Sequence, residues 1–153
     1  MRHGSDTLRE LAASTDPADR LRSLRLMREG IGAGDDPSIY LELAVPLVGD
    51  SDNNCRWQAI IVVGETVERN PEAVWKVACE HGTSADEDMR DAVATVLLEH
   101  LLEHHFDAYF PKLKQRIESG AYLLADTLSR CWLFDNAIRH KREVESLAAR
   151  QQR

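Results

Sequence analysis

The chain has 153 residues, with 26 acidic residues against 19 basic ones, and 43% of its residues are hydrophobic. This length suffices for a domain that buries a core without disulfides or a structural metal. The even spread of Leu, Ile, Val and Ala excludes a disordered chain. The longest apolar run, over 59–64, is far below the ~20 residues that a membrane-spanning helix needs, so we expect no membrane partner.

Charged residues occur throughout the first thirty positions, so we expect no secretory signal. The three cysteines, Cys55, Cys79 and Cys131, are widely spaced and form no Cys-x-x-Cys pair. Such cysteines are typical of reduced, mostly buried thiols. Together these features predict a cytoplasmic protein.

The whole chain has a helical pattern, because helix formers dominate and the few Pro and Gly residues lie between blocks of apolar periodicity. Asp16, Asp36 and Asn70 each precede a proline, which is the pattern of an N-cap followed by the first helical residue. Ser84 and Glu87 predict a capping box at another helix start. The sequence therefore predicts helices over 6–14, 17–30, 37–48, 52–69, 71–81, 85–104, 107–118, 121–134 and 136–151.

These helices repeat with a period of 34 residues. Arg22, Arg56 and Arg90 are separated by this interval, and the same offset relates Pro37 to Pro71. Caps, prolines and apolar positions superpose together at this offset. A repeat of this length that holds two helices is typical of an α-solenoid, in which each unit buries its apolar face against its neighbours.

The stretch 50–64 (DSDNNCRWQAIIVVG) resembles the HEAT-like repeat consensus, with Asp-x-Asp, an apolar residue, Arg, Ala and an apolar-Gly pair. The unit that begins at Ser84 is a looser match, and the first unit keeps Asp16, Leu21 and Arg22. Similar short HEAT-like repeats occur in phycobilisome lyases. The resemblance implies an all-α, right-handed α-solenoid of about four HEAT-like helical hairpins. It would form a single domain over 1–153, with an N-terminal cap helix over 1–15, repeats over 16–135 and a basic C-terminal helix over 136–153.

The resemblance also implies structural roles for the polar signature of the repeats. In this family the aspartate between the helices caps the second helix, and the arginine reaches polar groups of a neighbouring unit. The residues to which these roles carry over are Asp50, Asp52, Arg56, Asp86 and Arg90.

In HEAT-like folds the second helix of each unit lines the concave face. On the helices over 52–69 and 85–104, helical spacing turns a set of acidic and apolar residues away from the core stripe. Such a surface suits a protein partner with a basic, partly apolar segment. The predicted partner-binding residues are Trp57, Ile61, Glu65, Glu68, Asp91, Thr95, Glu99 and Leu102. Packing of Trp57 between adjacent repeats remains an alternative, while Trp75 is expected in the core and Trp132 at the end of the stack.

The segment from His100 to His104 fits the His-x-x-Glu-His pattern of inverted zinc peptidases. Two imidazoles at this spacing on a helix can share a Zn²⁺ ion, and Glu103 would serve as a general base. The apolar stripe, however, places His100 on the core side, where Thr66 lies one repeat earlier. We therefore expect no catalytic residue and no cofactor, and keep metal binding or metal-dependent hydrolysis at His100, Glu103 and His104 as the alternative.

A nucleic-acid partner is less consistent with the charge distribution. The stretch 50–110 contains 13 acidic and 4 basic residues, which would repel a duplex. The glycines in 30–34 follow a helix and lack the pattern of a phosphate-binding loop. Basic residues gather only in 136–153, and a homodimer through this helix is a further hypothesis. The sequence thus favours a non-catalytic scaffold or adaptor that binds a protein.

Overall fold

The computed structural model describes residues 4–152, which are helical and contain no strand. The expected all-α class is therefore confirmed for this part of the chain. Among these residues, no helix combines the length and apolar character that crossing a bilayer requires. The chain divides into two compact units, Met1–Thr66 and Val67–Arg153.

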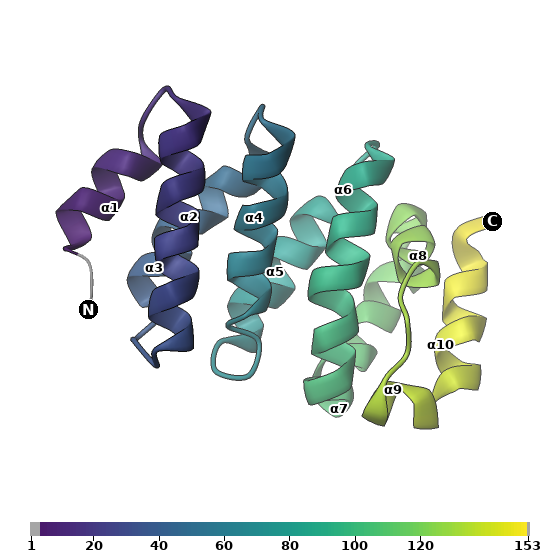
Figure 1. Cartoon of the computed structure of the whole chain (residues 1–153). Helices are drawn as coiled ribbons and strands as arrows, with labels where there is room; N and C mark the ends of the chain where they lie inside the picture. Colours follow the sequence, from purple (N-terminus) through teal and green to yellow (C-terminus); the bar gives the residue numbers. More distant parts are fainter. Residues whose placement is uncertain (1–3, 153) are drawn as a thin grey trace. The chain divides into compact units, whose positions relative to one another are not determined.

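In the first unit, α2 and α4 pack against each other, and α3 lies behind them (Figure 1). Leu24, Met27 and Ile60 are fully buried between these helices. Gly30 lets the buried ring of Tyr40 approach the backbone of α2, where a side chain would collide with it. The elements of this unit are α1 (Ser5–Ala12), α2 (Pro17–Gly32), α3 (Ser38–Ala44), the 3-10 segment η1 (Val45–Gly49) and α4 (Asn53–Gly64).

In the second unit, one long helical stretch of α6, η2 and α7 forms the centre, against which α5, α8 and α9 pack (Figure 1). It bends at His105, whose backbone is not helical (φ −138°, ψ 39°) and whose Nε2 lies 2.9 Å from the carbonyl oxygen of Val67. The elements are α5 (Pro71–His81), α6 (Glu87–Ala92), the π-helical segment η2 (Val93–Leu98), α7 (Glu99–Glu118), α8 (Tyr122–Ser129), α9 (Asp135–Arg139), α10 (Lys141–Ala148) and η3 (Ala149–Gln152).

Several predicted helix ends are wrong. The helix expected over 52–69 ends at Gly64, and the one expected over 121–134 ends at Ser129. The helix expected over 136–151 is two helices separated at His140 (φ −108°, ψ 23°). Trp132 therefore lies outside any helix and is 73% exposed, so it does not seal the end of a stack.

A common polar arrangement opens α2, α4 and α6. A side-chain oxygen two residues before the N-cap aspartate accepts a hydrogen bond from that aspartate's backbone N–H, at 2.8–3.1 Å. The aspartate then accepts from an N–H of the first helical turn, which would otherwise be unpaired. Ser84 thus supports Asp86 rather than forming the capping box predicted with Glu87. The three sets are Ser14, Asp16 and Arg20; Asp50, Asp52 and Arg56; and Ser84, Asp86 and Arg90.

The arginines of the first and third sets act in the same way. Arg90 donates to the carbonyl oxygen of Ser84 (2.6 Å) and to Asp126 of α8 (2.8 Å). Arg20 donates to the carbonyl oxygen of Ser14 (2.9 Å) and to Asp50 (3.0 Å). The structural counterpart of Arg90 in α2 is therefore Arg20, so the predicted equivalence with Arg22 is wrong by two residues.

Removing the third arginine tests this arrangement. We expect Arg90→Ala to lower the free energy of unfolding by about 1.5–3 kcal/mol, the range for hydrogen bonds to charged groups, because Asp126 keeps its hydrogen bond from Arg130. Lys114→Ala, at an exposed position of α7, should change it by less than about 0.5 kcal/mol. Urea denaturation followed by circular dichroism measures both, and equal stabilities of the two variants would contradict the role of Arg90.

The pairing of Arg90 with Asp126 also predicts how the stability of the fold changes at low pH. Burial raises the pKa of Asp126, but hydrogen bonds from Arg90 and Arg130 outweigh it and leave the pKa below its usual value. A carboxyl with a lowered folded-state pKa stabilises the fold above its unfolded pKa of about 3.9, and this contribution is lost as the pH falls further. The stability difference between the wild type and Arg90→Ala should therefore shrink below about pH 4.

Candidate functional site

The predicted partner-binding residues do not form one surface within either unit. Trp57 and Ile61 are half-buried on α4, and Glu65 forms an ion pair with Arg28 (2.8 Å). The remaining five belong to the second unit, where Asp91 forms an ion pair with Arg130 (2.7 Å). Of these five, Glu68 is exposed, Asp91 and Thr95 are half-buried, and Glu99 and Leu102 are buried.

The prediction was wrong for Leu102 and Glu99, which are only 1% and 7% exposed. Glu99 is covered by the segment after α8, whose Trp132 backbone N–H donates to its carboxylate. For Leu102 the cause is η2, because a π-helical turn bonds each N–H to the carbonyl five residues back and so inserts one extra residue. Every side chain after it is rotated by about 100° relative to a continuous α-helix. His100 correspondingly points outward with 43% of its side chain exposed, so its predicted core position is also wrong.

The surface between α2 and α4 carries charges of both signs. A groove of about 970 Å³ lies there, with Leu21 and Ile31 among its apolar residues. Three arginines of α2 line it together with Glu29 and Glu65, and Arg28 pairs with Glu65. The lining arginines are Arg22, Arg25 and Arg28.

The exposed large apolar side chains of the described chain gather in its C-terminal part. Trp132 lies at a groove of about 500 Å³ between α8, α9 and α10, which we call the Trp132 groove. Apolar side chains form most of its wall, and Lys141 and Glu145 form an ion pair at 3.7 Å among its polar residues. It is lined by Leu128, Ser129, Cys131, Trp132, Leu133, Ile138, Lys141, Val144, Glu145, Ala148 and Ala149. The sequence carried one signal for it, the apolar run from Trp132 to Phe134.

A buried carboxylate holds Trp132 in place. Oε1 of Glu99 accepts a hydrogen bond from the backbone N–H of Trp132 at 2.7 Å. The thiol of the preceding residue, Cys131, donates to the carbonyl oxygen of Ala94 at 3.4 Å. Burial raises the pKa of Glu99, partly opposed by that hydrogen bond from Trp132. The backbone of 131–132 is thus fixed to the η2–α7 helix while the indole ring stays in solvent.

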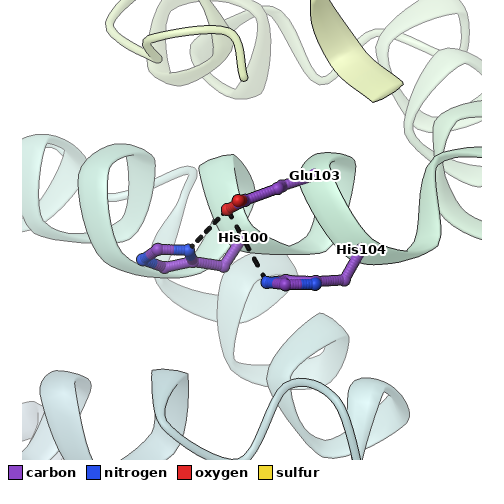
Figure 2. A group of neighbouring side chains, drawn as sticks. All are labelled: His100, Glu103 and His104. Carbon is purple, nitrogen blue, oxygen red and sulfur yellow. Dashed lines mark hydrogen bonds and ion pairs between the residues drawn. The ribbon is translucent and has the colours of Figure 1, made fainter. Parts of the chain in front are cut away.

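The three side chains of the histidine cluster, His100, Glu103 and His104, point to the same side of α7 (Figure 2) and are partly exposed. Nδ1 of His100 is 3.1 Å from Oε2 of Glu103, and Nε2 of His104 is 3.6 Å from the same oxygen. The two imidazole rings are nearly parallel, with centroids 6.4 Å apart. Glu68, from the turn after α4, brings Oε1 to 3.7 Å from Nδ1 of His104. One carboxylate therefore faces both rings, and a second carboxylate approaches one of them from another element.

The three cysteines do not show the properties of nucleophiles. Burial raises the pKa of both Cys55 and Cys79 to about 11, and burial also raises that of Cys131 well above its ordinary value. A reactive cysteine instead needs a lowered pKa, because the thiolate is the nucleophile. All three are free, and they stay protonated at neutral pH.

Comparison with known proteins assigns this chain to no family. The chain matches no protein-family model, no curated protein and no solved structure with which it was compared. The resemblance to HEAT-like repeats therefore stays a prediction. The candidate sites are the Trp132 groove and the histidine cluster.

The anchoring role of Glu99 can be separated from its charge. Glu99→Gln keeps an oxygen acceptor for the N–H of Trp132, so we expect the free energy of unfolding to stay equal to that of the wild type or to rise. Glu99→Ala leaves that N–H without its partner and should lower stability by about 1–3 kcal/mol. Exchange of the Trp132 amide hydrogen, followed by NMR, should accelerate only in Glu99→Ala. Equal acceleration in both variants would contradict the hydrogen bond, and Glu80→Ala at an exposed position of α5 is the control.

Proposed function

We propose that this chain is a non-catalytic protein-binding module that docks a segment of its partner in the Trp132 groove. The observation that carries the proposal is the indole ring of Trp132, 73% exposed beside an apolar groove. Exposed apolar patches of folded proteins mark interaction sites, and tryptophan is enriched among the residues that dominate binding energy. The free cysteines favour a cytoplasmic location, and the HEAT-like resemblance favours a scaffold or adaptor.

The energy available at this site is large enough for specific binding. A tryptophan side chain buries 150–250 Å² when it is covered, so covering the exposed part of Trp132 would contribute roughly 4 kcal/mol. The hydrogen bond between Glu99 and the backbone of Trp132 already fixes the segment. A partner would then lose less free energy in ordering this surface.

The charge around the groove indicates the chemistry of the partner. Between positions 130 and 150 the chain has five basic and three acidic residues, although its net charge is −7. Arg139 on α9 and Arg142 on α10 lie outside the lining of the groove, so this positive excess acts on the approach of a partner. An acidic segment with large apolar side chains therefore fits better than the basic segment expected from the sequence. A second copy of the chain fits less well, because two chains of charge −7 repel each other.

Selection from a random peptide display library tests this proposal without knowledge of the natural partner. On the immobilised full chain we expect enrichment of peptides that combine Asp or Glu with Leu, Phe or Trp. Trp132→Ala should weaken their binding at least about tenfold, since it removes more than 1.4 kcal/mol of the contact. Arg139→Glu combined with Arg142→Glu should weaken it as well, and fluorescence anisotropy of a labelled peptide measures both effects.

The matched control is Trp57→Ala, which changes a tryptophan of the first unit and should leave binding of the peptide unchanged. Enriched peptides that bind Trp132→Ala as well as the wild type would overturn the proposed site. Enrichment of basic peptides would overturn the proposed partner chemistry. A dimer in light scattering that Trp132→Ala dissociates would show that a second copy occupies the groove, and would also contradict the proposal.

A further inference from the structure

We propose that His100, Glu103 and His104 bind one divalent transition-metal ion on α7, and that Glu68 orients His104 for this binding. The site does not depend on the Trp132 groove. It is exposed because η2 turns His100 and His104 away from the core. The side chains belong to the second unit, and three of the four come from a single helix.

The distances lie close to those of a metal centre. The candidate ligand atoms of the three α7 residues all lie within 4.8 Å of one another. Ligands of a tetrahedral Zn²⁺ ion, bound at about 2.0–2.1 Å, are separated by about 3.3 Å. The two nitrogen–carboxylate distances, 3.1 and 3.6 Å, already meet this spacing. The two imidazoles would have to approach each other by up to about 1.5 Å, and rotation of two partly exposed side chains can supply this without repacking the core.

Glu68 has the position of an outer partner rather than a ligand. Its carboxylate lies beside Nδ1 of His104, whereas Nε2 of the same ring faces Glu103. An Nδ1–H donated to Glu68 leaves the lone pair on Nε2, which is the atom that would bind the metal. A carboxylate that fixes the tautomer and orientation of a metal-binding histidine in this way raises metal affinity. Glu68 is therefore a positioning residue.

The three ligand atoms of the proposed site determine which metal ions it favours. Two imidazole nitrogens and one carboxylate oxygen suit Zn²⁺, Ni²⁺, Co²⁺ or Cu²⁺, while Mg²⁺ and Ca²⁺ prefer oxygen ligands alone. Three protein ligands leave at least one coordination position for water or for a group from another molecule. The net charge of −7 favours the approach of a cation.

Isothermal titration calorimetry of the full chain with ZnCl₂ and NiCl₂ tests the site. We expect one ion per chain, with binding abolished by His104→Ala and by His100→Ala. Glu68→Gln should weaken binding about tenfold, the lower end of the range for outer carboxylates. Nitrogen-15 NMR of the His104 ring should show a proton on Nδ1 in the wild type, and loss of this tautomer preference in Glu68→Gln. Glu68→Asp should restore part of the affinity.

His140 and Glu143 supply an internal control. Their Nδ1–Oε1 distance of 3.2 Å and their spacing along the chain match those of His100 and Glu103, but Val144 stands where a second histidine would be needed. His140→Ala should therefore leave metal binding unchanged. Binding that survives His104→Ala, or that His140→Ala weakens equally, would overturn the site and show an adventitious ion only. Unchanged affinity and tautomer in Glu68→Gln would overturn the role of Glu68. Circular dichroism of each variant confirms that it is folded.

Discussion

One helical stretch, from α6 to α7, carries one candidate site of this protein and anchors the other. The π-helical turn η2 inserts one residue into the stretch from α6 to α7, and this rotates every later side chain. Glu99 follows this turn directly and is covered by the segment after α8, where its carboxylate holds the backbone of Trp132. His100 and His104 are turned outward, beside Glu103 and within reach of Glu68. π turns inside helices are rare, and they are frequent at functional sites.

Local polar contacts fix the starts of helices in each of the two units. An aspartate caps α2, α4 and α6, and in α2 and α6 an arginine joins the preceding loop to a carboxylate further along the chain. Arg90 is 6% exposed, so its pairing with Asp126 and with the carbonyl oxygen of Ser84 is needed to offset its burial. These contacts fix α6 relative to α8, and α8 forms one wall of the Trp132 groove.

The sequence predicted the helical class and most helix starts, because caps and prolines act locally. It also predicted the break near His105 and the burial of Trp75. It could not predict η2, since a π turn carries no sequence pattern and arises from packing on both sides of the helix. The wrong positions predicted for His100 and Leu102 follow from this. The extended segment at Trp132 was missed for another reason: its apolar residues have helical character, and a hydrogen bond that its backbone donates to the distant Glu99 decides its path.

The most direct test of this account is covalent labelling of His100 by diethyl pyrocarbonate in the native chain, followed by mass spectrometry. The account predicts that His100 reacts at a rate close to that of the chain in urea, because η2 leaves its imidazole partly in solvent. A continuous α-helix would instead continue the apolar stripe through His100 and protect it. Strong protection of His100 would contradict the register, and with it the arrangement of the metal site.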